Sequence, residues 1–225
     1  MGTQPRMPFD ERRKLIITRV RELFAHKGLE GATSRELAQA AGVSEGLLFK
    51  HFPNKEALFL AMLESLEASL PDNIQKSLSL EPSTSTLILI VHTLVTELLS
   101  LHSEEFNDIT RIYLRSLAGD GEFAHVALRK ARERLIPKIE ENIKAAEASG
   151  DIDESLVPYR MRAWFVDRLA FVLLVDLLPP VPAVDYRIPR GELVREAVRF
   201  LLRGIGLKEE VIRRLYTAEG AFLDA

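Results

Sequence analysis

The stretch ATSRELAQAAGVSEGLLFKHFPNKEALF, residues 32–59, decides the fold of this chain. Thr33 and Glu36 stand three residues apart, which is the spacing of a capping box at the start of a helix. Gly42 follows a narrow apolar stripe and ends that helix where a left-handed residue costs least. Ser44 then offers its hydroxyl to the free N–H groups of a second helix. Since only a short turn separates the two caps, the sequence predicts a helix–turn–helix.

The second helix, expected from about Glu45 to His51, has an unusual outer face. Leu48 and Phe52 are predicted to face the core of the domain. The residues left for the outer face are Glu45, Gly46, Leu47, Phe49, Lys50 and His51. An exposed glycine with two large apolar side chains suits a surface that is pressed against another surface, and glycine allows close backbone approach. Leu47 fits a thymine methyl, Glu45 fits a cytosine amino group, and Lys50 and His51 fit a phosphate or a base edge.

The next helix has a positive charge in its first turn, where the helix dipole disfavours it. Pro53 ends the second helix, Asn54 caps the third, and Lys55 lies in its first turn. A cation at that position opposes the helix dipole, so it indicates another partner, such as a phosphate.

Taken together, residues 42–59, GVSEGLLFKHFPNKEALF, resemble the DNA-binding signature of the TetR family of bacterial transcriptional regulators. The resemblance covers roughly residues 10–60. It implies an all-helical, two-domain homodimer that binds a palindromic operator and releases it when a small ligand binds. It also implies DNA contacts at Thr33, Ser34, Ser44, Gly46, Leu47, Phe49, Lys50, His51 and Lys55. Phe49 stands where the family usually has a tyrosine, and Glu45 where a neutral or basic residue is frequent.

Composition and charge fit this interpretation. The 225 residues are 47% hydrophobic and 28% charged, and they include no cysteine, which excludes disulfides and thiolate metal sites. Residues 1–60 hold 10 Lys and Arg against 7 Asp and Glu, a balance of +3, whereas the remainder holds 20 against 26, a balance of −6. The N-terminus has no apolar signal region and no apolar run is long enough for a membrane span, so we expect a cytoplasmic protein.

Helical periodicity continues to the end of the chain, and we expect an all-α fold of about ten helices. We expect residues 1–55 to form a three-helix DNA-binding domain and residues 56–225 a ligand-binding and dimerisation domain. Pro137 is expected to kink or split one long helix. The expected helices span residues 10–27, 34–41, 45–51, 54–70, 84–102, 104–118, 122–149, 155–178, 190–205 and 208–219, with a loop or short helical piece at 71–85.

Polar side chains inside the apolar C-terminal helices indicate a small-molecule pocket, because such pockets combine apolar walls with a few convergent polar groups. The candidate lining residues are His92, Thr96, Arg111, Tyr113, Trp164, Asp167, Arg168 and Phe171. Each of them singly also fits a surface position or a satisfied core hydrogen bond. The prediction therefore concerns the region and an effector of unknown identity.

No catalytic or metal motif stands out, and we expect no enzyme activity, no cofactor and no metal site. The segment from Ser155 to about Leu178 is apolar on more than one face, and the resemblance implies that this helix and the helix of Arg190–Leu202 pair with their mates in a four-helix dimer interface. The sequence thus predicts a dimeric, ligand-responsive DNA-binding repressor. Two alternatives stay open: a constitutive DNA binder, and a helical enzyme or small-molecule carrier that has kept the helix–turn–helix.

Overall fold

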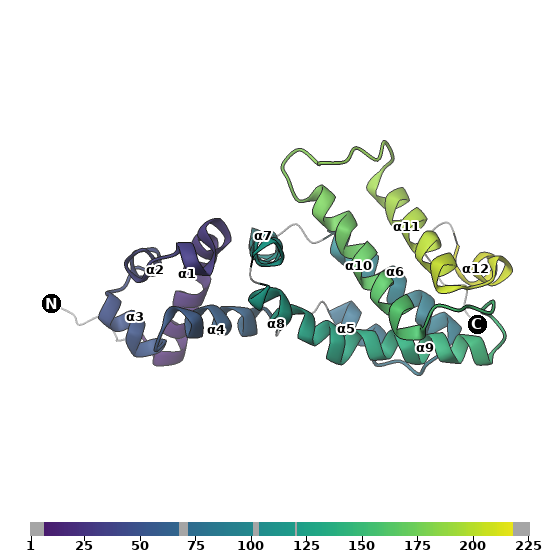
Figure 1. The fold of residues 1–225 in the computed structure, drawn as a ribbon, viewed down its shortest axis with the longest axis horizontal. Helices are drawn as coiled ribbons and strands as arrows, with labels where there is room; N and C mark the ends of the chain where they lie inside the picture. Colours follow the sequence, from purple (N-terminus) through teal and green to yellow (C-terminus); the bar gives the residue numbers. More distant parts are fainter. Residues whose placement is uncertain (1–6, 68–71, 101–103, 120, 218–225) are drawn as a thin grey trace. The chain divides into compact units, whose positions relative to one another are not determined.

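The computed structural model describes residues 7–67, 72–100, 104–119 and 121–217. The predicted all-α fold is confirmed, since the only strand-like pairing in these ranges is a single bridge between Ile152 and Leu207. The helices in Figure 1 are α1 (Phe9–Gly31), α2 (Ser34–Ala41), α3 (Glu45–His51), α4 (Lys55–Glu67), α5 (Asp72–Leu78), α6 (Thr84–Ser100), α7 (Glu104–Ala118), α8 (Glu122–Lys130), a π-helical turn (Ala131–Leu135), α9 (Ile136–Ala148), α10 (Tyr159–Leu177), α11 (Arg190–Ile205) and α12 (Glu209–Leu215).

These helices form two compact units. The first unit combines residues 1–69 with 103–127, and the second combines residues 70–102 with 128–225. The boundary predicted between residues 55 and 56 concerns the division of function, and it stays a prediction. In terms of packing, α4, α7 and most of α8 belong with the helix–turn–helix.

Aromatic rings hold the first unit together. Phe24 of α1 meets Phe59 of α4 with ring centroids 5.0 Å apart, and Phe59 meets Phe123 of α8 at 5.4 Å. Tyr113 of α7 completes the cluster at 6.3 Å from Phe123. Edge-to-face geometry of this kind is favourable beyond the apolar area it buries. The cluster therefore fastens α7 and α8 to α1 and α4, the helices beside the helix–turn–helix.

Helix α1 differs from its prediction at both ends. The helix was expected to span residues 10–27, but it begins at Phe9 after Pro8, and Asp10 lies in the first turn. Gly28 interrupts it with φ +70° and ψ 178°, and the chain then makes one further turn to Gly31. The backbone conformation requires glycine, and a Cβ at residue 28 would also meet the Cδ of Arg115 at 3.0 Å, so the arginine side chain would have to shift.

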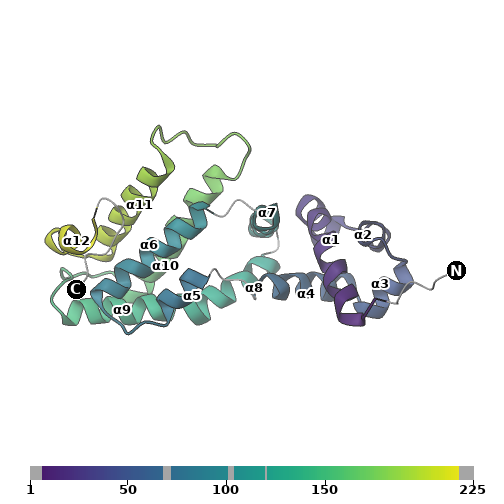
Figure 2. The ribbon, with the colours of Figure 1, turned by 180° about the vertical axis from the view of Figure 1, so that it is seen from behind.

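In the second unit, α6 packs against α5, α9, α10 and α11 (Figures 1 and 2). Its inward face is fully buried and consists of branched aliphatic side chains. These include Leu87, Ile88, Val91, Val95 and Leu99. The apolar run that the sequence contains at this place is therefore the centre of the second core. None of the helices within the described ranges is both long and apolar enough to cross a membrane.

Pro137 splits the long helix, as predicted. Its ring has no N–H to donate and would collide with the carbonyl four residues earlier, so a regular helix cannot pass through it. The helix instead widens into the π-helical turn Ala131–Leu135, and α9 then begins with Pro137 in its first turn. This split and the short helix α5 explain why the described chain has more helices than the ten expected.

The capping box predicted at α2 is confirmed. The Glu36 N–H donates to the Thr33 Oγ1 at 3.3 Å, and the Thr33 N–H donates to the Glu36 Oε2 at 3.1 Å. The Lys27 ammonium donates to the other carboxylate oxygen at 2.5 Å. The Lys27 hydrogen bond, followed by those of Thr33, lowers the pKa of Glu36 from 4.5 to about 2. The carboxylate therefore ties α1 to the start of α2.

Glu36→Gln removes this charge but keeps an acceptor at the third helical position. Because folding lowers the pKa, the contribution of the carboxylate is fully present above about pH 4.5 and is lost as the pH falls through about 2. We expect the variant to have a lower Tm than the wild type at pH 7, and the difference to shrink as the pH falls through this window. Thermal unfolding followed by circular dichroism measures it, with the exposed Glu22→Gln as control. An equal Tm difference at pH 7 and at pH 2 would show that the charge is unimportant.

Candidate DNA-binding site

The turn between α2 and α3 is short and held by backbone hydrogen bonds. Gly42 has φ +69°, and its N–H donates to the Gln39 carbonyl at 3.1 Å, while the Val43 N–H donates to the Ala38 carbonyl at 3.0 Å. Ser44 starts α3 by accepting the Leu47 N–H at 3.2 Å. The predicted helix–turn–helix is thus confirmed, with the boundaries of α3 at Glu45 and His51.

The inner face of α3 is fixed from α1. Leu48 and Phe52 are buried, as predicted. The Arg13 guanidinium lies 4.3 Å from the centre of the Phe52 ring and donates to the His51 carbonyl at 2.9 Å. One side chain of α1 therefore holds the C-terminal end of α3 by a cation–π contact and a hydrogen bond.

The outer face of α3 combines an open backbone with exposed apolar and charged groups. Glu45, Gly46, Phe49 and Lys50 are exposed, and Leu47 is half-buried. A Cβ at residue 46 would meet no atom within 4 Å, so packing inside the unit does not require glycine there. The face is flat at Gly46 and carries a phenyl ring and an ammonium beside it, which suits contact with another molecule.

His51 was predicted on this outer face, and that placement is wrong. Its side chain is only 6% exposed, because the ring of Phe9 stacks on it with centroids 4.1 Å apart. Burial, with the nearby Arg12, Arg13 and Lys50, lowers the pKa of His51. The Nδ1 atom is buried and has no hydrogen-bond partner among the described residues. A DNA contact by His51 stays a prediction, and it now depends on how Phe9 is placed.

The two hydroxyls predicted to contact DNA already serve as helix caps. Thr33 and Ser44 are exposed, and each accepts a backbone N–H of the helix it starts. Ser34 is half-buried in the first turn of α2. Their contacts to DNA stay predictions, as do those of the outer-face residues.

Lys55 has a partner within the chain that the sequence did not reveal. Its ammonium donates to the Leu29 carbonyl at 3.0 Å and lies 3.8 Å from the Glu30 carboxylate. The cation in the first turn of α4 therefore satisfies the end of α1, and its position does not depend on a phosphate. Its contact to DNA likewise stays a prediction.

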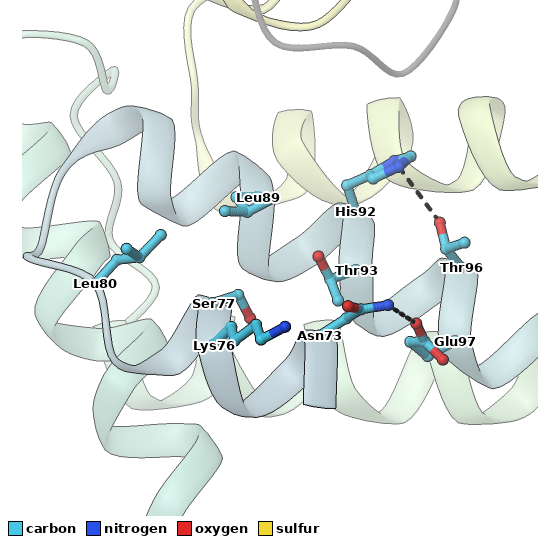
Figure 3. Close-up of a pocket in the computed structure, with 9 residues that line it drawn as sticks. All are labelled: Asn73, Lys76, Ser77, Leu80, Leu89, His92, Thr93, Thr96 and Glu97. Carbon is cyan, nitrogen blue, oxygen red and sulfur yellow. Dashed lines mark hydrogen bonds between the residues drawn. The ribbon is translucent and has the colours of Figure 1, made fainter. Parts of the chain in front are cut away.

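A pocket lies in the second unit between α5 and α6, with a volume of about 360 Å³ (Figure 3). It is lined by Asn73, Lys76, Ser77, Leu80, Leu89, His92, Thr93, Thr96 and Glu97. His92 and Thr96 are the two predicted ligand residues that line it. Most of the others were missed because residues 71–85 carried only weak helical signals, and three lining residues lie on α5.

Four other predicted ligand residues form a separate cluster on α10. The Arg168 guanidinium pairs with the Asp167 carboxylate, its Nε donating at 2.7 Å. It also lies 5.9 Å from the centre of the Trp164 ring and 5.3 Å from that of Phe171. Burial raises the pKa of Asp167, whereas Arg168 opposes that rise. None of the four is among the residues that line the pocket.

The remaining two predicted ligand residues belong to the first unit. Arg111 of α7 pairs with Asp108 at 3.1 Å, and Tyr113 lies in the aromatic cluster with Phe123. The eight predicted residues are therefore not brought together into one site. Periodicity located the region but could not assign each polar group to its unit.

An all-helical fold with an outward-facing helix α3 in a helix–turn–helix is typical of DNA-binding regulators. Residues 16–62 match the family described as bacterial regulatory proteins, tetR family. The nucleoid occlusion factor SlmA of Vibrio cholerae is 31% identical over 160 residues, which cover 64% of this chain and 82% of that protein. The chain belongs to the tetR family of bacterial regulatory proteins.

Other similarities agree with this family. SlmA of Mannheimia succiniciproducens is 39% identical over 75 residues, but the match spans only 35% of that protein and 33% of this chain. The solved structure of NalD, the secondary repressor of the MexAB-OprM multidrug efflux pump in Pseudomonas aeruginosa, has a TM-score of 0.65 at 21% identity and covers 89% of this chain and 98% of its own. A tetR-family regulatory protein from Rhodococcus has a TM-score of 0.66 at 18% identity, with 88% and 99% covered.

Lys50→Ala tests the electrostatic part of DNA binding. Lys50 is exposed and has no ion-pair partner within the described ranges, so its charge is available to a phosphate. We expect the variant to lower the slope of log affinity against log salt by about one and to leave Tm unchanged. Lys55→Ala is the comparison, and it should lower Tm because it removes the Leu29 contact. Fluorescence anisotropy with duplex DNA from upstream of the protein's own gene measures the slope, and an unchanged slope for Lys50→Ala would remove this residue from the phosphate contacts.

Glu45→Gln tests whether the start of α3 reads sequence. An exposed carboxylate at that position either accepts a hydrogen bond from a cytosine or only favours the helix dipole. If it reads a base, we expect a changed preference at one operator position in a binding series over single-base operator variants. A uniform change over all variants would assign Glu45 to the helix dipole alone.

Proposed function

We propose that this protein is a transcriptional repressor that binds a palindromic operator as a homodimer and is released by a small-molecule effector. The observation that carries the proposal is the outer face of α3, where Gly46, Phe49 and Lys50 are exposed without serving the packing of the unit. NalD, which has a similar fold, is described as a repressor. We expect the protein to act in the cytoplasm, where chromosomal DNA is accessible to it.

An apolar stripe on α10 supports the homodimer. Met161, Phe165, Leu169 and Val172 follow each other at helical spacing, and each is between 42% and 51% exposed. Phe200 on the neighbouring helix α11 is 68% exposed. Single exposed apolar residues are ordinary, but a continuous stripe of them on paired helices marks an interaction surface. A second copy of the same two helices would cover it and would give two reading helices for two half-sites.

Phe165→Glu should break this interface, because dimerisation would bury an unpaired carboxylate on each copy. We expect a monomer by light scattering after size exclusion at micromolar concentration, together with loss of operator affinity. Leu117→Glu is the matched control, since Leu117 is 51% exposed on α7 in the first unit. A variant that stays dimeric with unchanged operator affinity would argue against an interface through α10.

The pocket between α5 and α6 supports the effector response. An effector needs to bind the DNA-incompetent conformation better by roughly 1–3 kcal/mol, a typical coupling energy. Linkage then requires that operator DNA weaken effector binding by the same factor. Titrating an effector with and without operator tests this, and equal affinities would support the constitutive DNA binder instead.

A second candidate function is that of a nucleoid occlusion factor. The similarity to SlmA of Vibrio cholerae extends over 160 residues and therefore reaches well beyond the helix–turn–helix. The two functions differ in what happens when the protein is removed. Altered transcript levels of genes near its binding sites support the repressor, whereas a loss of nucleoid occlusion with unchanged transcripts supports the second candidate.

We further infer that the protein is not an enzyme and uses no cofactor. The membership of a family of DNA-binding regulators supports this inference. The alternative of a helical enzyme or carrier with a retained helix–turn–helix predicts at most weak DNA binding without sequence preference. Competition between the upstream duplex and a scrambled duplex of the same length distinguishes the two.

A further inference from the structure

The groove between α5 and α6 has an apolar side and a polar side. Leu80 and Leu89 contribute the apolar wall, whereas Lys76, Ser77 and Thr93 lie across the space between the two helices (Figure 3). All lining residues belong to the second unit. The groove is therefore formed entirely within the second unit. The side chains drawn in Figure 3 determine which ligands it can bind.

Thr93 carries a hydroxyl that has no hydrogen-bond partner among the residues that the structure describes. The residue is only 8% exposed, yet its Oγ1 makes no hydrogen bond with any described residue. Other helical threonines of this chain behave differently, since Thr18 and Thr110 donate to the carbonyl four residues earlier at 3.1 and 2.9 Å. Thr93 is one of the residues that line the groove (Figure 3). A hydroxyl without a protein partner on the wall of a groove is a donor for a bound molecule.

Lys76 supplies a positive charge on the opposite side. Its ammonium forms no ion pair within the described part of the chain, in contrast with Lys138, which pairs with Glu141 at 2.8 Å. The acidic member of the lining, Glu97, is held by the Asn73 amide, whose Nδ2 donates to it at 2.9 Å (Figure 3). The Asn73 amide is neutral, so Glu97 keeps its negative charge, and the ammonium of the exposed Lys76, which has no ion-pair partner among the described residues, is available to a ligand.

His92 adds hydrogen bonding without adding charge. Its Nδ1 lies 3.1 Å from the Tyr216 hydroxyl and its Nε2 lies 3.5 Å from the Thr96 hydroxyl. Burial lowers the pKa of His92, so the ring is neutral at pH 7. Lys76 therefore remains the charged donor on the groove wall.

We propose that this groove binds a small monocarboxylic acid with a short apolar body. The carboxylate accepts hydrogen bonds from the Lys76 ammonium and the Thr93 hydroxyl, and the apolar body lies against Leu80 and Leu89. A volume of about 360 Å³ is at the small end of ligand pockets, which suits a molecule of this size. The inference deepens the proposed effector response and depends on it only for the link to DNA.

Hexanoate is the probe, and 1-hexanol and hexylamine are its controls with the same number of carbon atoms. Calorimetric or NMR titration of the full chain without DNA should give the order hexanoate, then 1-hexanol, then hexylamine in decreasing affinity. Lys76→Gln should weaken hexanoate binding about three- to tenfold without changing 1-hexanol binding. Thr93→Val, which keeps the shape of the side chain, should weaken both. Lys144→Gln, at an exposed lysine of α9 outside the groove, should change neither.

Equal affinity of the three probes, or unchanged hexanoate binding in Lys76→Gln, would overturn the carboxylate site. Circular dichroism of each variant establishes that it folds, and backbone amide shifts in α5 and α6 locate the probe. A separate titration of operator complexes with hexanoate tests the proposed function. Hexanoate binding without any effect on the operator complex would leave the site standing and contradict the effector response.

Discussion

The carbonyl groups at the C-terminal ends of helices have no partner within their own helix, and this chain satisfies them with basic side chains from elsewhere. In the first unit, Arg19 donates to the Ala41 carbonyl at the end of α2 at 3.0 Å, and Arg13 to the His51 carbonyl at the end of α3 at 2.9 Å. Lys55 donates to Leu29 near the end of α1 at 3.0 Å. The placement of α3 depends on these long-range caps, because the helix is only seven residues long and too short to be stable alone.

The second unit uses the same device. Arg162, almost fully buried in α10, donates to the Ile205 carbonyl at the end of α11 at 2.9 Å, and Arg190 donates to Leu99 near the end of α6 at 3.0 Å. A cation at the negative end of a helix is favourable both as a donor and as a charge. For residues 1–60 this has a cost in available charge: Arg13, Arg19 and Lys55 hold helices together, so the balance of +3 overstates what is free to meet phosphates.

Local signals predicted the reading motif well, and contacts distant in sequence explain what they missed. The caps at Thr33 and Ser44 and the left-handed Gly42 act within four residues, so α2 and α3 could be placed from sequence. The burial of His51 depends on Phe9, 42 positions away in the chain, and the partner of Lys55 lies in another helix. Only His92 and Thr96 of the pocket lining were predicted, because α5 is short and its sequence carries a weak helical signal. Tyr113 was wrongly assigned to the pocket because its neighbour Phe123 belongs to a different helix of the first unit.

The π-helical turn Ala131–Leu135 has a consequence for the phase of the helical run in which it lies. One such turn is equivalent to an extra residue in an α-helix, and it rotates everything downstream by about 100° around the axis. Helix α8 directs Phe123 into the aromatic cluster of the first unit, and α9 directs Ile139 into the second core. Because of the turn between them, the two side chains need not follow the periodicity of one straight helix. The chain enters the second unit near residue 128, just before this turn. The apolar periodicities of the two helices are thereby uncoupled, and each segment is free to change its sequence to suit its own unit.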